Sequence, residues 1–277
     1  GLARDLGRLT AKERVKTDPE DLYAYGGDAT YYVKRGKPDA VVLPETTNEA
    51  SQVMKYAFHN AVPVTPRGAG SGLSGGCTPL RGGIVLDMKR MGQILEINRR
   101  NMSARVEAGV VLADFHKTVK KEGLFYPPNP QSMNVCTLGG NVATRACGPH
   151  GVKYGATGDY VMGLEGVLPD GSVIAPGGMA ARSSAGYDLT HLFAGSEGTL
   201  GVITEARLRA MPLATQKATC IVYFTDLQQA CGAIPKIYDL GVSCFDTAVT
   251  TNLDLIRETF PQLNIRPDAK VMYLIEF

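Results

Sequence analysis

A glycine-rich stretch, Pro66-Arg67-Gly68-Ala69-Gly70-Ser71-Gly72-Leu73-Ser74-Gly75-Gly76, is the strongest local signal for chemistry in the sequence. Glycines at this density exclude a helix or strand interior, so the stretch is predicted to be a loop. Glycine permits positive φ angles, and successive N–H groups in such a turn form a concave anion-binding nest, to which Arg67 adds charge. We expect this loop to hold a phosphate or pyrophosphate; a plain tight turn is the alternative.

Two common phosphate-binding motifs do not fit this loop. The spacing Gly68-x-Gly70-x-Gly72 differs from the G-x-G-x-x-G of Rossmann folds and from the G-x-x-x-x-G-K-[ST] of Walker A loops. The segments Thr78-Pro79 and Arg81-Gly82-Gly83 keep the chain in turns, so no helix is predicted to follow. A Rossmann dinucleotide site is therefore disfavoured.

Two further clusters of small residues resemble this loop in composition. Residues 137–144 (Thr-Leu-Gly-Gly-Asn-Val-Ala-Thr), with Gly148 after them, offer backbone donors and side-chain hydrogen bonds without bulk. Residues 195–203 (Gly-Ser-Glu-Gly-Thr-Leu-Gly-Val-Ile) lead into a strand. Each cluster alone could be an ordinary turn. Three of them on separate strands favour a long ligand lying across the fold, and a dinucleotide fits best.

Cysteine and histidine residues give no sign of a metal site. The six cysteines are isolated, with no C-x-x-C pair and no histidine at ligand spacing; they are Cys77, Cys136, Cys147, Cys220, Cys231 and Cys244. Such spacing indicates reduced thiols in a cytoplasmic protein and no metal. Among the histidines, His116 is predicted to lie on a helix as a surface or packing residue. His150 lies in the glycine-rich stretch and is the better candidate for substrate contact.

The elements that must position these clusters are those of a mixed α+β protein. Apolar runs and turn residues predict strands at 40–44, 62–65, 83–87, 94–97, 104–109, 161–168, 172–175, 200–208, 220–224, near Phe245 and at 271–277. Helical periodicity predicts helices at 47–60, 112–122 and 227–240. The first 40 residues have helical and turn character, and residues 127–158 are too rich in Gly and Pro for any regular element. Composition changes near Pro212.

Composition excludes several classes of protein. The chain has 277 residues, 44% of them hydrophobic and 20% charged, which excludes a disordered tail. A net charge of +2 is too balanced for a nucleic-acid surface. No apolar run reaches the roughly 20 residues of a membrane-spanning helix, and the first 21 residues show no signal peptide.

The motifs together resemble a known family. The glycine loop, Gly139-Gly140-Asn141, Lys153-Tyr154-Gly155, Gly186-Tyr187-Asp188-Leu189 and the segment 195–201 occur in the order found in FAD-linked oxidases of the vanillyl-alcohol oxidase type. Among these oxidases, the chain looks most like glycolate oxidase FAD subunits and D-lactate dehydrogenases, and the resemblance covers residues 39–212. The resemblance implies a two-lobed PCMH-type FAD-binding domain, followed by the first part of a ferredoxin-like α+β cap domain.

The resemblance also implies the domain limits and the cofactor-binding residues. Residues 1–38 would be a lead-in, 39–212 the FAD-binding domain and 213–277 the start of a truncated cap or substrate domain. The phosphate loop would comprise Pro66, Arg67, Gly68, Ala69, Gly70, Ser71, Gly72, Leu73, Ser74 and Gly75. The flavin and ribityl chain would be lined by Pro130, Ser132, Met133, Thr137, Gly139, Gly140, Asn141, Ala143 and Thr144, with Gly148, Tyr154 and Gly155 nearby. Glu197, Gly198, Gly201, Val202 and Ile203 would approach the adenosine or ribityl part.

The function that the resemblance implies is oxidation of a small 2-hydroxy acid of the D-lactate or glycolate type. A hydride would pass to flavin N5, and the electrons would leave to an iron–sulfur subunit or a quinone. Such partners could hold the cytoplasmic protein at the inner face of a membrane. The resemblance is also compatible with a homo-oligomer. FAD is expected to be non-covalent because Ser71 stands where certain covalent relatives carry His.

Two alternatives to this function stay open at the level of sequence. The chain could be an FAD-binding electron-transfer subunit or fragment without a complete active site, since it ends inside a predicted strand at Phe277. It could also be an alkylglycerone-phosphate-synthase-like flavoenzyme, because Arg145-Ala146-Cys147-Gly148 stands where glycolate oxidase relatives usually read Asn-Ala-Gly-Gly. The family's substrate-side histidines and metal ligands lie beyond residue 277, so the catalytic base is unknown and no residue is assigned to it.

Overall fold

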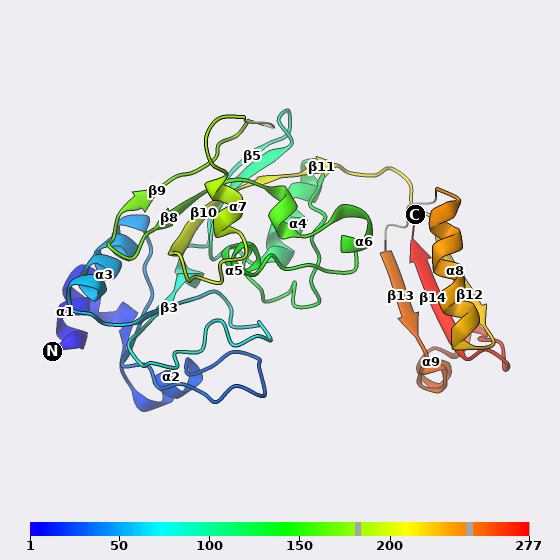
Figure 1. The fold of residues 1–277 in the computed structure, drawn as a ribbon, viewed down its shortest axis with the longest axis horizontal. Coiled ribbons are helices and arrows are strands. Elements are labelled where there is room, and N and C mark those ends of the chain that lie inside the picture. Colours follow the sequence, from blue (N-terminus) through cyan, green and yellow to red (C-terminus); the bar gives the residue numbers. More distant parts are fainter. Residues whose placement is uncertain (181–183, 242–245, 277) are drawn as a thin grey trace. The chain divides into compact units, whose positions relative to one another are not determined.

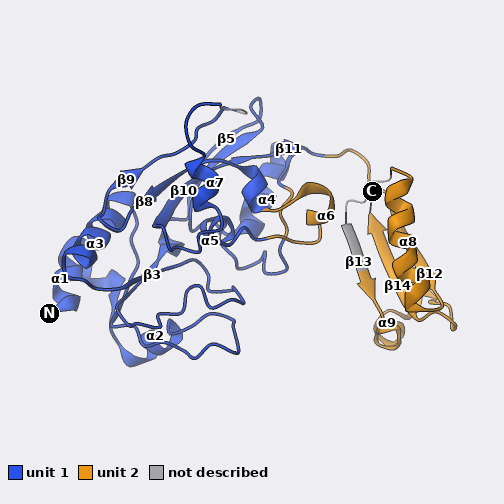
Figure 2. Ribbon diagram, viewed as in Figure 1, with its two compact units in different colours: residues 1–126, 130–146, 157–213 blue, residues 127–129, 147–156, 214–277 orange. Residues whose placement is uncertain are grey.

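The structure, a computed structural model, describes residues 1–180, 184–241 and 246–276. These residues form a mixed α+β fold with several sheets, which confirms the predicted fold class (Figure 1). They group into two compact units, coloured in Figure 2. The first unit comprises residues 1–126, 130–146 and 157–213, and the second comprises residues 127–129, 147–156 and 214–277.

The first sheet of unit 1 is a buried, mostly parallel sheet. Its strand order is β1 (Val15–Lys16), β2 (Ala40–Val42), β4 (Ile84–Asp87) and β3 (Val64–Arg67). β2 and β3 both run parallel to β4, and every residue of β2 and β4 is buried. Continuous apolar runs of this kind are typical of strands covered on both faces. The short two-residue β1, which was not predicted, adds an antiparallel edge.

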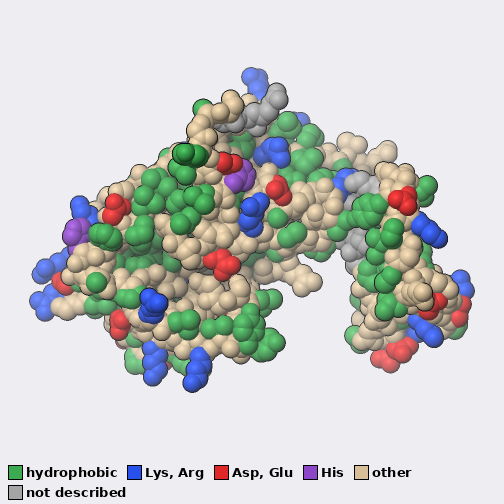
Figure 3. Space-filling model, viewed as in Figure 1, with side chains coloured by type: hydrophobic (Ala, Val, Ile, Leu, Met, Phe, Trp, Pro, Cys, Tyr) green, Lys and Arg blue, Asp and Glu red, His purple; other side chains and the backbone are tan. Residues whose placement is uncertain are grey.

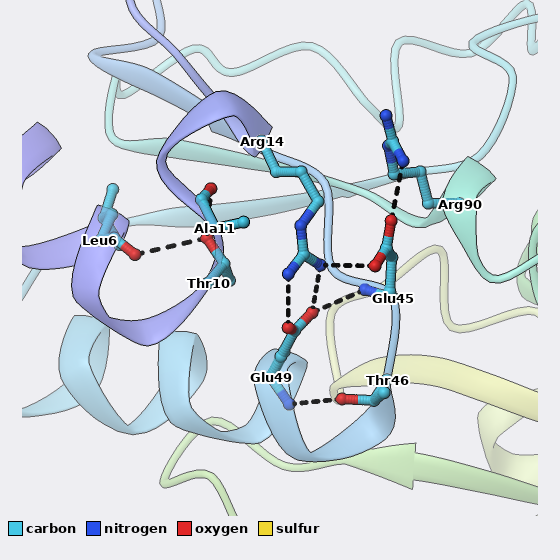
Figure 4. Close-up of polar contacts among 8 residues, drawn as sticks. All are labelled: Leu6, Thr10, Ala11, Arg14, Glu45, Thr46, Glu49 and Arg90. Carbon is cyan, nitrogen blue, oxygen red and sulfur yellow. Dashed lines mark hydrogen bonds and ion pairs between the residues drawn. The ribbon is translucent and has the colours of Figure 1, made fainter.

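Helix α3 (Thr47–His59) crosses between β2 and β3 and confirms the predicted helix. The Thr46 hydroxyl accepts from the Glu49 amide, and the Glu49 carboxylate accepts from the Glu45 amide, so the helix start is capped in both directions. Arg14 donates to both oxygens of Glu49 and also pairs with Glu45, which pairs in turn with Arg90 (Figure 4).

The N-terminal residues contain α1 (Leu2–Leu9), the 3₁₀ turn η1 (Lys12–Arg14) and α2 (Pro19–Ala24). This fulfils the expected helical and turn character. Leu6 of α1 is fully buried and belongs to the same core cluster as Val53 and Met54 of α3. The lead-in residues are therefore packed into the first unit.

The second sheet of unit 1 is antiparallel, with five strands. Its order is β5 (Ile94–Asn98), β6 (Ser103–Glu107), β10 (Val202–Arg209), β8 (Val161–Val167) and β9 (Val173–Ile174). The predicted strands are confirmed with ends shifted by at most two residues. The sequentially adjacent β4 and β5 lie in different sheets, joined through η2 (Met88–Arg90).

Shorter elements complete the first unit. They are α4 (Leu112–Lys121), which was predicted, and β7 (Leu124–Phe125), α5 (Leu138–Thr144), η3 (Thr157–Tyr160), α7 (Leu189–Phe193) and β11 (Met211–Pro212), which were not. On the face shown in Figure 3, acidic and basic side chains are interspersed over the centre of this unit, in line with the small net charge.

The prediction that residues 127–158 hold no regular element is wrong, because α5 lies within them, as does the single turn α6 (Gly151–Tyr154). The helix α5 forms despite two glycines because the Thr137 hydroxyl caps it, accepting from the Gly140 amide. Its glycines are also needed for close packing: a β-carbon on Gly139 would overlap Ala108. Tertiary contact here outweighs the low helix propensity of glycine.

The second unit has its own three-stranded antiparallel sheet, ordered β12 (Thr219–Phe224), β14 (Val271–Glu276) and β13 (Asp246–Thr250). The helices are α8 (Leu227–Asp239) and α9 (Leu253–Thr259), followed by the turn η4 (Pro261–Leu263). The predicted strands and helix of this region are present, although Phe245 and Phe277 lie outside the described residues. In the described part of the chain, no helix is long and apolar enough to cross a membrane.

Candidate functional site

A cleft in the first unit receives residues from its two larger sheets. Its empty space, including the part open to solvent, is about 970 Å³. Residues of β3, α5 and β10, which Figure 1 shows near one another, are part of its lining. The three small-residue segments identified in the sequence all contribute to its walls.

The loop after β3 forms one wall of the cleft. Gly70 and Gly75 have φ angles of +69° and +80°, a backbone conformation that side chains rarely adopt. A β-carbon on Gly68 would collide with the Thr137 hydroxyl, since Gly68 lies against the start of α5. The glycines therefore let the loop turn sharply and approach α5 closely.

Helix α5 forms another wall, and one of its side chains carries an unused hydrogen-bond donor. Asn141 is 4% exposed, and its Nδ2 is buried with no hydrogen-bond partner. A buried amide without a partner costs about 1–3 kcal/mol, so such groups are normally satisfied. Because Asn141 lines the cleft, an acceptor atom of a ligand is the partner that this donor lacks.

The turn at residues 195–203 joins the other two segments. Gly195, Glu197 and Gly198 all have positive φ angles, of +93°, +50° and +79°. The Glu197 amide donates to the Ala143 carbonyl of α5 at 2.9 Å, and the Ser74 hydroxyl donates to the Glu197 carboxylate at 3.5 Å. The three segments are thus linked directly to one another around the cleft.

Most of the residues predicted to bind a cofactor line this cleft. They are Pro66, Arg67, Gly68, Ala69, Gly70, Ser71, Gly72, Ser74, Ser132, Thr137, Gly139, Gly140, Asn141, Ala143, Thr144, Glu197, Gly198, Gly201, Val202 and Ile203. Four predicted residues of the first unit are not part of its walls: Leu73, Gly75, Pro130 and Met133. The side chain of Leu73 is 69% exposed. Gly148, Tyr154 and Gly155 belong to the second unit and do not line the cleft.

Other residues of the cleft were absent from the prediction. They are Asp28, Gly76, Cys77, Met88, Ala108, Cys136 and Ala146. Gly76 ends the glycine loop, and Ala108 precedes the glycine that ends the predicted strand 104–109, so both could have been found from the sequence. Nothing in the local pattern around Asp28 signals its position, which depends on folding of the N-terminal segment against the loop.

The thiol of Cys77 lies near one cationic and one anionic side chain. Its Sγ lies 3.7 Å from Arg67 Nη1 and 3.9 Å from Asp28 Oδ2. Burial raises the pKa of this thiol, while the nearby guanidinium acts in the opposite direction. Cys77 is therefore in its neutral form near neutral pH and is not an activated nucleophile.

Arg145 and His150, both singled out in the sequence, have structural partners. Arg145 ends α5 in the left-handed conformation (φ +48°), packs against Gly158 and Gly195, and lies 3.8 Å from Asp159. It does not line the cleft. The Nδ1 of His150 lies 2.8 Å from the Pro127 carbonyl oxygen, within the second unit. Arg145 thus has a structural role at the end of α5, outside the walls of the cleft.

Comparison with known proteins identifies the family. The sequence pattern of an FAD binding domain matches residues 38–176, half of the chain. The chain belongs to this FAD-binding family. The cofactor of the family, FAD, is a dinucleotide, as the three converging segments suggested.

Curated relatives extend the similarity beyond the family match. The chain is 40% identical to glycolate oxidase subunit GlcD of Bacillus subtilis, over 92% of this chain and 54% of that protein. It is 36% identical to a D-lactate dehydrogenase of Anaerostipes hadrus, over 82% of this chain and 48% of that protein. The chain therefore spans about half the length of the curated relatives that it matches.

Solved structures of the same fold include an alkyldihydroxyacetonephosphate synthase, with a TM-score of 0.86 at 24% identity, and p-cresol methylhydroxylase, with a TM-score of 0.81 at 18% identity. The similarity covers 100% and 99% of this chain, and 55% and 59% of those chains. At these identities the likeness establishes the PCMH-type fold of the FAD-binding family, as the sequence resemblance predicted.

Proposed function

We propose that this protein is an FAD-dependent oxidoreductase that oxidises a small 2-hydroxy acid of the D-lactate or glycolate type. The observation that carries the proposal is the meeting of three small-residue segments around one cleft, in a chain of an FAD-binding family. The substrate class comes from relatives named glycolate oxidase subunit and D-lactate dehydrogenase, which match four-fifths or more of the chain.

The residues of the cleft fit the chemistry of FAD. The buried Asn141 amide lacks an acceptor, and FAD offers carbonyl, ribityl and phosphate oxygens. Gly68 and Gly140 lie close to each other, and the absence of side chains lets the loop backbone approach the start of α5 at the wall of the cleft. Met88, Ala108, Val202 and Ile203 add apolar surface to the same cleft, as a flavin ring requires.

Each segment has a distinct task in this proposal. The backbone amides of the loop 67–74 bind the pyrophosphate, since a nest of N–H groups suits an anion. Asn141 donates to the flavin or its ribityl chain, and the apolar residues keep water from the ring. FAD supplies the redox chemistry when bound, by accepting a hydride from C2 of the substrate at N5. Ser71, which lines the cleft, stands where certain covalent relatives carry His, and the proposal therefore has the cofactor held non-covalently.

The domain limits and the partners belong to the same proposal. Residues 39–212 would form the FAD-binding domain, and residues 213–277 the start of a cap domain that covers the substrate. Electrons would leave to an iron–sulfur protein or a quinone. No residue of this chain is assigned as the base that takes the hydroxyl proton.

Reconstitution with FAD followed by anaerobic mixing with substrate tests the proposal. Purified protein should bind FAD with a resolved flavin spectrum, and D-lactate or glycolate should bleach it, while L-lactate serves as the matched control. Binding of FAD without bleaching by any small 2-hydroxy acid would support an electron-transfer subunit instead. A protein that gains no flavin absorbance would refute the proposal.

A further inference from the structure

The guanidinium of Arg67 is anchored to residues near the N-terminus. Its Nη1 donates to the Gly27 carbonyl oxygen at 2.7 Å, and its Cζ lies 5.2 Å from the centroid of the Tyr25 ring. Arg67 is the last residue of β3 and the first of the glycine loop. The side chain therefore ties the beginning of the loop to the segment 25–27.

This anchored guanidinium also supports the loop itself. Gly70 has a φ of +69°, and a β-carbon placed there would overlap the Arg67 guanidinium. The loop backbone thus packs directly on the side chain that precedes it by three residues. The position of the guanidinium consequently determines where the Gly68–Gly70 backbone can lie.

Tyr25 is held in place by a buried polar network. The tyrosine is 8% exposed, its hydroxyl donates to Asp87 Oδ2 at 2.7 Å, and it accepts from Lys89 Nζ at 2.5 Å. Asp87 is 1% exposed, and its other oxygen accepts from the Lys89 backbone amide at 3.0 Å. Asp87 also ends β4, beside Arg67 in the parallel register, so the network is built on the first sheet.

A second cavity shows why this support is needed. It has about 450 Å³ of empty space, counting its open side, and is lined by Ala24, Tyr25, Arg67, Gly68, Ala69, Asp87 and Lys89. Arg67, Gly68 and Ala69 also line the main cleft, so this short segment separates two spaces. Without the Tyr25 ring, the guanidinium would have room to move into the second cavity.

We propose that Tyr25 is a positioning residue of the dinucleotide site, acting through Arg67 to hold the glycine loop in its binding conformation. The inference rests on the proposed function, because the loop is taken to bind the pyrophosphate of FAD. It assigns the start of the chain to the cofactor site, although this segment lies outside the glycine-rich motifs. The attraction between a guanidinium and an aromatic face strengthens as the pair is removed from water, and here the Tyr25 ring is buried and Arg67 is half-buried.

A double-mutant cycle tests the proposal through FAD affinity. Tyr25→Leu removes the ring and should weaken FAD binding by about tenfold, measured by flavin fluorescence in a titration. In an Arg67→Ala background the same Tyr25→Leu change should cost less than about twofold, because its effect passes through Arg67. Equal losses in both backgrounds would overturn the proposal. ADP, which lacks the flavin, should show the same pattern as a competitor.

Matched variants separate positioning from general destabilisation. Tyr23→Leu removes another tyrosine that stacks on an arginine, Arg35 at 4.6 Å, but Tyr23 is 71% exposed and outside the cleft. This variant should bind FAD as the native protein does. Tyr25→Phe keeps the ring and lacks only the hydroxyl, so it should fold and lose about threefold in affinity. Native affinity in both Tyr25 variants would contradict the proposal.

A measurement without FAD distinguishes failure of this proposal from failure of the proposed function. The Arg67 guanidinium lies beside the half-buried Cys77 thiol and acts to lower the pKa of that thiol, so its release in Tyr25→Leu should reduce the thiolate fraction and slow alkylation of Cys77 in the apoprotein. A native protein that binds no FAD would refute the proposed function alone. An alkylation rate of Cys77 unchanged by Tyr25→Leu would refute the positioning of Arg67.

Discussion

The Gly139 amide donates a hydrogen bond to the Ala108 carbonyl oxygen at 2.8 Å, and a β-carbon added to Gly139 would lie 2.5 Å from the Ala108 β-carbon. The Ala108 amide donates in turn to the Thr204 carbonyl of β10 at 2.8 Å. Ala108 therefore fixes α5 against the second sheet with no spare space. The position of α5, which forms one wall of the cleft, therefore depends on the absence of a side chain at Gly139.

Gly139→Ala should displace α5 and weaken both folding and cofactor binding. The new methyl group meets backbone atoms of Ala108, which cannot yield as a flexible side chain would. Overpacking of this kind costs about 1–3 kcal/mol of unfolding free energy. Chemical denaturation of the apoprotein measures that loss, and an FAD titration measures the expected fall in affinity.

Gly232→Ala is the matched control for this substitution. Gly232 lies inside α8, in the second unit, and a β-carbon there would meet nothing within 4 Å. The change should stabilise the helix by up to about 1 kcal/mol, because alanine has the higher helix propensity. Similar effects of both substitutions would show that the contact with Ala108 is not the cause.

The sequence predicted the first sheet well because its signal is local. The strands around Val41 and Val85 are short apolar runs, and the helix between them begins with a threonine cap and a glutamate three residues later. Helix α5 was missed because its stability comes from elsewhere. The chain of residues 127–158 has the glycine and proline content of a loop, and only the contact with Ala108 and the Thr137 cap makes part of it helical.

In the candidate site, too, the residues with a local sequence signal were predicted, and those placed by long-range contacts were not. Glycines of the loop and of residues 195–203 were found because glycine is costly unless a turn or a close approach requires it. The orientation of Arg67 could not be predicted, since it depends on a tyrosine forty-two residues earlier in the chain. The cleft residue Asp28 escaped notice for the same reason: its contact with Cys77 is long-range.

Cys77 should react with iodoacetamide far more slowly than the exposed cysteines. Its thiol is half-buried, and burial raises its pKa, so little thiolate is present at neutral pH. Cys147, Cys220 and Cys231 are exposed and serve as internal controls in the same sample. Mass spectrometry of timed digests gives each rate. Bound FAD should slow Cys77 further, because this residue lines the cleft; a rate equal to that of Cys147 would contradict its burial.

Glu49→Gln should lower the melting temperature at neutral pH but not in acid. Hydrogen bonds from Arg14 hold the pKa of Glu49 below its usual 4.5. The stabilisation is therefore complete above about pH 4.5 and is lost as the pH falls through the lowered pKa. Melting curves from pH 7 down to acid should converge for variant and native protein. Glu96→Gln, at an exposed position of β5, is the control and should change little.

Glu205→Gln should have the opposite effect to Glu49→Gln and raise the melting temperature at pH 7. Burial and repulsion from Glu165, its neighbour across the strands β10 and β8, raise the pKa of Glu205 despite the nearby Arg105. The ionised carboxylate thus destabilises the folded state at a pH above its raised pKa, and the amide removes that cost. Below about pH 4.5 the carboxyl is protonated in both states, so the advantage of the variant should vanish. A lower melting temperature at pH 7 would mean that the ion pair with Arg105, at 3.2 Å, outweighs burial.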